Sequence, residues 1–465
     1  MLAALGGALA LVLARWGVSL ILSMLPLATI PAPLAFQLDA RVLGFAALLS
    51  VLSALLFGLA PALRATPINL ANALRSTQGA TAPKGVRHVG RVLMAFQVGL
   101  SVLLLVGAGL FLQTLRNLAH VDIGFNPDKL LQVLIDTRAA GYRRGDVGGV
   151  HRLMLERIGS IPGVQSVTSL RNPIMRGPMG RGMMQLPGLT PSPGDFWDSA
   201  VVGPNFFETL EIPLLRGRTF AAPEFESHRA IVVNDAWVRK YFPNDDPVAK
   251  GIGVLGVVGN VRLAGVRTAG APTVFHMTSP ELDRLNSLLV RTPAEPAAVI
   301  PAIREALSGI NPQLLVDVRT MRQEIATDIA TERMVAATSS FFGLLGLLLV
   351  SIGIFGVASY TVAQRTTELG IRMALGAGRW SVIRDSLQDT MLVFGAGLAV
   401  GILAAIAGVR LLGNFVSDLL FGLRATDALS VIVAVLLMAT VAVLACILPA
   451  RHATRIDPLT AIRCE

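Results

Sequence analysis

Six long apolar runs constrain the fold of this chain more than any other feature. Each approaches or exceeds the roughly 20 residues that an α-helix needs to cross about 30 Å of hydrocarbon. The chain is 53% hydrophobic and only 15% charged, whereas soluble domains carry about 25% charged residues. A long polar stretch separates the third run from the fourth. The sequence therefore predicts an α-helical integral membrane protein with about six transmembrane helices and one large extramembrane domain. The runs cover about residues 2–25, 42–63, 92–113, 336–360, 387–412 and 427–448.

Basic residues are concentrated in three of the short segments between or after these runs. Residues 64–91, residues 361–384 and the C-terminal tail hold five, four and three Lys or Arg residues, whereas residues 26–41 and 413–426 offer only Arg41 and Arg424. By the positive-inside rule, the three basic segments are cytoplasmic. The large domain then lies in the periplasm, and the protein is a multi-pass protein of the cell inner membrane. A basic cytoplasmic face accounts for the net charge of +10, so we expect no nucleic-acid partner.

One passage of the chain occurs twice. Residues 60–75 read APALRATPINLANALR and residues 448–463 read LPARHATRIDPLTAIR. Residues 7–20 also match residues 398–411. Internal duplication is typical of membrane transport proteins that are built from repeats. Because nothing before Met1 corresponds to residues 92–390, the pattern predicts that the chain begins partway through a first unit, through truncation or a start codon assigned too late.

Strand and helix signals alternate through the polar stretch. Asn234 is placed to cap a helix that Pro243 ends. Residues 172–194 are rich in Gly, Pro and Met and favour a mobile loop, with an adaptable surface for apolar ligands as the alternative. Together these signals predict an α+β domain. Strands are expected over residues 130–135, 164–170, 231–233, 252–261 and 288–291, and helices over 147–158, 235–242, 297–307 and 318–335.

Patterns for catalysis or cofactor binding are absent from the sequence. There is no GxxxxGK[ST] phosphate loop and no HExxH zinc motif. Cys446 and Cys464 have neither metal nor redox spacing. We therefore expect no catalytic residue, no metal and no cofactor in this chain, and any energy for transport must come from a partner.

The segment after the fourth run, residues 359–387, carries more specific information. If it is helical, Glu368 and Arg372 are four residues apart in the favourable order for an ion pair. Gly370, Gly376 and Gly378 permit close approach or a bend. These residues alone leave two interpretations open, a surface amphipathic helix and an element that docks a partner.

Five sequence blocks carry a family resemblance. RTTELGIRMALGAGRWSVIR (365–384) and PARHATRIDPLTAIR (449–463) are similar to the MacB/FtsX/LolC-E class of ABC transporter permeases, and so are three blocks at 201–220, 230–252 and 255–262. The doubled basic tail resembles the subgroup in which two permease units are fused. The resemblance implies residues 1–80 as the end of a first FtsX-like unit, 90–115 as the first helix of a complete unit, 116–335 as a MacB-like periplasmic core domain, and 336–465 as an FtsX-like permease domain.

The resemblance also implies function and partners. A separate ABC ATPase would bind ATP and dock on the cytoplasmic segment 361–384, so the chain itself would not be an enzyme. Export of amphipathic cargo is the implied activity, with membrane lipid around the helices, a periplasmic adaptor or outer-membrane partner, and a homodimer as further partners. Two alternatives are a regulatory mechanotransmitter and an inert truncated remnant. The residues implied in ATPase coupling are Glu368, Gly370, Ile371, Arg372, Gly376 and Ala377.

Overall fold

The computed structural model describes most of the chain, in two compact units. Leu118–Ala330 form one, called here the sheet unit, and Met1–Asn117 with Thr331–Glu465 form the other, called here the helical unit. The described residues are 2–23, 44–45, 47–48, 51–52, 84–142, 147–182, 196–220, 230–268, 270–277, 287–364, 379–411, 421 and 428–453.

Within the residues that the structure describes, four helices are long and apolar enough to cross a membrane. They correspond to the last four of the six predicted spans. The first predicted span contains helix α1, whose apolar part, Leu5–Gly17, is shorter, and most of run 42–63 lies outside the described residues. The structure therefore supports an integral membrane protein, with four spans rather than six identified in its described part. The helices are α1 (Leu2–Ser23), α4 (Lys84–Ala119), α10 (Ala330–Gln364), α12 (Arg379–Leu411) and α14 (Ala428–Ala453).

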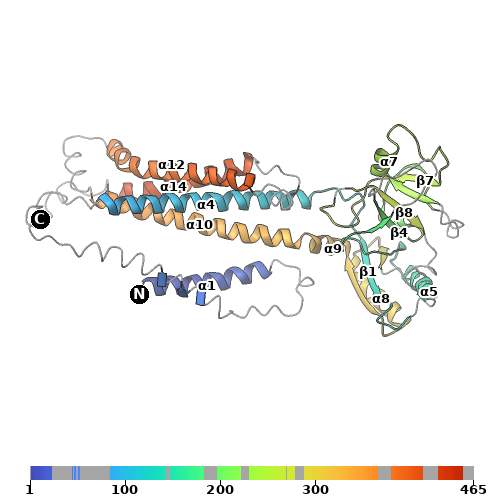
Figure 1. The fold of residues 1–465 in the computed structure, drawn as a ribbon. Coiled ribbons are helices and arrows are strands. Elements are labelled where there is room, and N and C mark those ends of the chain that lie inside the picture. Colours follow the sequence, from blue (N-terminus) through green and yellow to red (C-terminus); the bar gives the residue numbers. More distant parts are fainter. Residues whose placement is uncertain are drawn as a thin grey trace, which may run out of the picture. The chain divides into compact units, whose positions relative to one another are not determined.

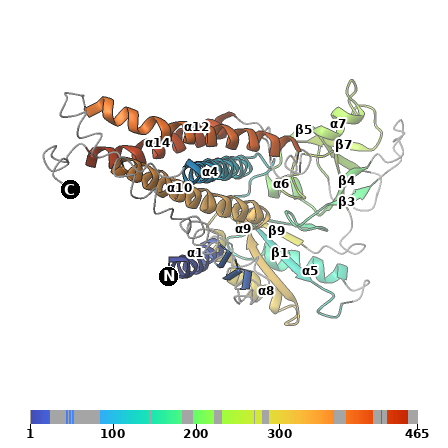
Figure 2. The ribbon, with the colours of Figure 1, turned by 60° about the vertical axis from the view of Figure 1, so that its left-hand side comes forward.

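Helix α4 lies at the centre of the helical unit. Val98 and Val102 of α4 are fully buried, as are Ile354 of α10 and Met438 of α14. Figures 1 and 2 both show α4, α10, α12 and α14 running side by side. Small residues let α4 approach its neighbours closely. Such tight packing favours the association of helices in a membrane, where apolar side chains gain little from leaving lipid.

The strands of the sheet unit form one mixed sheet. Their order is β10-β1-β9-β2-β4-β8-β6-β7-β5, with β3 paired to β4 off this path. The pairs β4–β8 and β6–β7 are parallel and the other pairs are antiparallel. The strands are β1 (Leu130–Asp136), β2 (Ser166–Leu170), β3 (Gly180–Gly182), β4 (Trp197–Val202), β5 (Leu214–Gly217), β6 (Ile231–Asn234), β7 (Val254–Val258), β8 (Thr273–Met277), β9 (Ser287–Arg291) and β10 (Leu315–Thr320).

Two separate apolar cores divide this sheet into lobes. Lobe A comprises β10, β1, β9 and β2 with helices α5 (Val147–Gly159) and α8 (Pro296–Ser308), and its core includes Met154 and Ile303. Lobe B comprises β4, β8, β6, β7 and β5 with helix α7 (Asp235–Tyr241), and its core includes Trp237. In Figure 1, α5 and α8 lie at one end of the sheet and α7 at the other. The short helix α6 (Phe206–Leu210) packs on β2 and β9.

Local sequence signals agree with much of the sheet unit. The Asn234 side chain accepts a hydrogen bond from Trp237 N at 3.0 Å, which confirms the predicted cap of α7. The predicted helix over 318–335 is wrong at its start, since Leu315–Thr320 form β10. Thr320 then caps helix α9 (Met321–Asp328) through a capping box, and Ile329 separates α9 from α10.

The predicted mobile loop is also corrected in its described part. Within residues 172–182, Ile174, Met175 and Met179 are buried, and Met175 N donates a hydrogen bond to Leu263 O at 2.8 Å. This part of the loop is thus built into the sheet unit. Residues 183–194 of the same prediction lie outside the described residues.

Candidate functional site

The residues that the sequence implicates in ATPase coupling all lie in a segment that the structure does not describe. Glu368, Gly370, Ile371, Arg372, Gly376 and Ala377 fall within residues 365–378, outside the described residues. The described geometry points instead to the two places where the chain enters and leaves the sheet unit. We call residues 120–129, which follow α4, the first stem. We call residues 321–330, which comprise α9, Ile329 and the first residue of α10, the second stem.

The connection between β7 and β8 holds the first stem. We call residues 260–268 of this connection the strap. Arg262 N donates to Ile123 O at 2.9 Å, and Arg262 Nε donates to Asp122 O at 3.2 Å. Gly124 has a φ of +80°, and a Cβ at this position would lie 1.8 Å from Asn260 O. Only glycine combines this backbone angle with so close a crossing.

The strap also holds the second stem. Val266 N donates to Asp328 Oδ2 at 2.7 Å. A Cβ built at Gly265 would lie 3.3 Å from the same carboxylate. Arg262 Nη1 donates to Val266 O at 3.1 Å and to Thr268 O at 2.5 Å, which folds the strap upon itself. One segment of nine residues therefore holds both stems.

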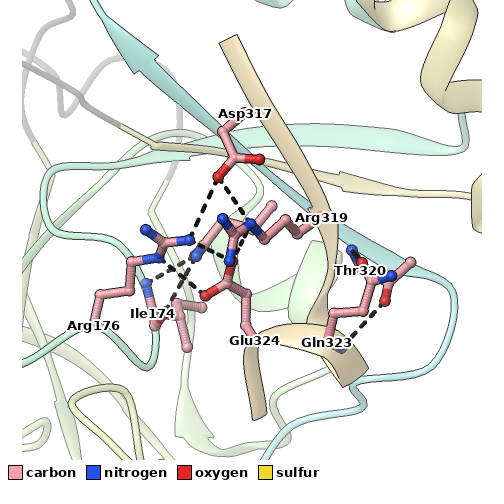
Figure 3. A network of polar contacts seen from close by, with 8 residues as sticks. Ile174, Arg176, Asp317, Arg319, Thr320, Gln323 and Glu324 are labelled. Atoms are coloured by element: carbon pink, nitrogen blue, oxygen red, sulfur yellow. Dashed lines mark hydrogen bonds and ion pairs between the residues drawn. The ribbon is translucent and has the colours of Figure 1, made fainter. Parts of the chain in front are cut away.

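A buried carboxylate ties the second stem to the loop after β2. Glu324 of α9 is only 1% exposed and accepts two hydrogen bonds from Arg176, at 3.0 Å from Nε and 2.8 Å from Nη2. Asp317 and Arg319 of β10 extend this network (Figure 3). The hydrogen bonds to Glu324 raise the pKa of Arg176. Such a bidentate pair fixes the orientation of its two partners as well as their separation.

The two stems are also joined directly. Arg322 Nε donates to Asp128 Oδ1 at 2.5 Å, and this contact lowers the pKa of Asp128. The guanidinium of Arg291 at the end of β9 is buried and donates to Asn126 O at 2.9 Å and to Asp128 O at 3.0 Å. It also contacts Thr209 O and pairs with Glu211 at 3.2 Å. The buried Arg291 side chain thus supplies hydrogen-bond donors to backbone carbonyl groups of the first stem.

The strands continue this connection into lobe A. The first stem leads into β1 and the second stem follows β10, and these two strands pair from Leu131↔Thr320 to Asp136↔Leu315. A displacement of either stem would therefore reach lobe A through β1 and β10 and reach lobe B through the strap.

The sequence did not point to Arg176, Glu324, Arg262 or Asp328. Arg176 and Glu324 are 148 positions apart, and their pairing depends on the folded sheet rather than on local spacing. One signal was present, since Arg262 closes a block, LGVVGNVR, that resembles the permease class. Nothing in the sequence marks that block as the part that receives the stems.

Comparison with known proteins gives matches at both the family and the sequence level. Residues 340–458 match the family "FtsX-like permease C-terminal". The chain is 23% identical over 282 residues to the macrolide export ATP-binding/permease protein MacB of Mannheimia succiniciproducens, covering 57% of this chain and 43% of that protein. It is 27% identical over 292 residues to MacB of Hahella chejuensis, covering 57% and 42%. The chain thus spans less than half the length of these curated relatives.

A solved structure, the periplasmic region of MacB from Actinobacillus actinomycetemcomitans, is 14% identical. The match has a TM-score of 0.30 and covers 44% of this chain and 95% of that one. The FtsX-like match lies over α10, α12 and α14, which are three of the four membrane-length helices. The family match and the curated relatives together support a MacB/FtsX-type ABC permease.

Proposed function

We propose that this protein is the permease subunit of an ABC-type complex of the cell inner membrane, with the sheet unit in the periplasm. A separate ATPase binds and hydrolyses ATP, and the resulting movement of α4 and α10 is delivered to the sheet unit. The observation that best supports this role is the shared strap, which holds both stems through Ile123, Asp122 and Asp328. The basic cytoplasmic segments predicted from the sequence support the orientation.

The cytoplasmic segment 361–384 is proposed to dock the ATPase. The resemblance assigns this role to Glu368, Gly370, Ile371, Arg372, Gly376 and Ala377. Replacing Glu368 and Arg372 together by alanine should abolish ATPase binding and leave the membrane-embedded chain folded. The measurement is co-purification of the ATPase with a C-terminally tagged chain, followed by ATP hydrolysis in nanodiscs. Glu305→Ala on the exposed face of α8 is the matched control. ATPase recovery at the wild-type level with the double variant would refute the assignment.

The cargo is proposed to be amphipathic. The curated relatives bear names that describe macrolide export, and we extend that class to this chain together with a periplasmic adaptor or outer-membrane partner and a homodimer. Deleting the gene should increase susceptibility to macrolides or other amphipathic compounds, and the wild-type gene should restore resistance. If gentle extraction recovers no ATPase and deletion changes no susceptibility, the proposed function is wrong.

A further inference from the structure

The pairing between neighbouring strands of the sheet unit is shortest between β2 and β4. These strands share a single register pair, Leu170↔Val202, whereas every other neighbouring pair shares three or more. Two further backbone hydrogen bonds flank that pair, from Arg171 N to Val201 O at 3.0 Å and from Gly203 N to Ser169 O at 2.8 Å. We call this boundary between lobes A and B the seam.

The seam contains buried hydroxyl groups without a protein hydrogen-bond partner in the described part of the chain. The hydroxyl groups of Thr168 and Ser169 on β2, and of Ser287 opposite Leu170 on β9, are fully buried. None of the three has a hydrogen-bond partner within the described part of the chain. Buried hydroxyl groups without partners destabilise the state that buries them, because water would otherwise satisfy them. Contacts other than the β2–β4 pairing also join the two lobes, among them helix α6, which follows β4 of lobe B and packs on β2 and β9 of lobe A.

One loop supplies such contacts from both lobes and from the second stem. In the loop that follows β2, Ile174 forms two hydrogen bonds with the Gln132 side chain of lobe A, at 2.8 Å and 3.2 Å. The next residue, Met175, is bonded to Leu263 of the strap. Arg176 is then paired with Glu324 of α9 (Figure 3). The three consecutive residues Ile174–Arg176 therefore connect lobe A, the strap between β7 and β8 of lobe B, and the second stem.

We propose that lobes A and B rotate about the β2–β4 seam, and that the Arg176–Glu324 ion pair is the latch that holds the closed form. Displacement of α9 would withdraw Glu324 from Arg176 and release the loop from the second stem. The seam, with one register pair and unsatisfied hydroxyl groups, would then open. The hinge is a property of the sheet unit, so it goes beyond the proposed function and requires neither the ATPase nor any cargo.

The test measures the distance between the lobes in the full chain, reconstituted in nanodiscs without an ATPase. Cys446→Ala and Cys464→Ser remove the native thiols. Spin labels are attached at Glu156→Cys on α5 and Arg239→Cys on α7, two exposed positions in different lobes. Pulsed electron paramagnetic resonance then gives the distance distribution for the wild-type latch and for Glu324→Gln, which keeps the side-chain shape and removes the charge. Glu305→Gln on α8 is the matched control.

We expect one narrow distribution for the wild-type latch and for Glu305→Gln, and a second, displaced population for Glu324→Gln. A distribution for Glu324→Gln that matches the wild type would overturn the proposal. A wild-type distribution already as broad as that of the variant would overturn the latch. If circular dichroism shows that Glu324→Gln does not fold, Arg176→Gln is measured in its place. This variant removes the same ion pair by changing its half-exposed partner, and the same two outcomes decide the test.

Discussion

At the scale of single residues, His151 makes the stability of the sheet unit depend on pH. The side chain is fully buried on α5, and burial lowers its pKa from 6.5 to about 4. The unfolded chain takes up a proton near pH 6.5 and the folded chain only near pH 4, so stability falls as the pH drops through this window. A pKa difference of this size corresponds to a loss of up to about 3 kcal/mol. His151→Leu should reduce the pH dependence of thermal unfolding between pH 7 and pH 4.5 without abolishing it, because burial also lowers the pKa of His276.

The control for this prediction is Met154→Leu, because Met154 is a fully buried residue of the same helix and carries no titratable group. This variant should retain the wild-type slope of stability against pH. If His151→Leu and the wild type lose the same stability between pH 7 and pH 4.5, then His151 is not the group responsible.

The close crossing at Gly124 gives a second prediction at the residue scale. Gly124 and Gly141 have nearly the same φ, +80° and +81°, but a Cβ at Gly141 would meet nothing within 4 Å. Alanine at Gly141 should therefore show the cost of the backbone angle alone, about 1 kcal/mol. Alanine at Gly124 should cost clearly more, because it also pushes the first stem off Asn260. Chemical denaturation of both variants measures the difference, and equal losses would contradict the role given to the strap.

At the scale of elements, the crossing of α4 and α12 depends on small residues. A Cβ at Gly397 would lie 2.6 Å from Ala95 O, and one at Gly401 would lie 2.7 Å from Gly99 O. Gly401→Ala should separate the two helices and destabilise the helical unit by about 1–3 kcal/mol, the usual cost of overpacking. Gly408→Ala, on the same helix with nothing within 4 Å, is the control. Thermal stability in detergent distinguishes them, and equal melting temperatures would show that the crossing tolerates a side chain.

The same scale shows what the sequence could and could not predict. The strand β1, the helix α5 and the Asn234 cap of α7 follow from hydrophobic period and capping, signals that act within a few residues. Residues 318–320 illustrate the limit, since the sequence predicts them as the start of a helix over 318–335. They instead form the end of the strand β10, which pairs with β1. The strap and the Arg176–Glu324 pair were not predicted at all. They join residues far apart in the chain, and no local pattern encodes which polar side chains the sheet brings together.

At the scale of the whole molecule, the proposed coupling requires each stem to be a stiff link. Ile329 is the short break between α9 and α10, and Asp328 beside it is held by the strap. If the proposed function holds, three flexible residues, Gly-Ser-Gly, inserted after Ile329 should leave the proposed ATPase bound but abolish resistance to the proposed cargo. A flexible tether dissipates the movement that a helix transmits. The same insertion after Gly309, at the exposed end of α8, is the control and should retain resistance. Co-purification and drug susceptibility are measured together for both variants. Full resistance with the insertion after Ile329 would mean that the second stem does not carry the movement, and the first stem alone would then have to supply it.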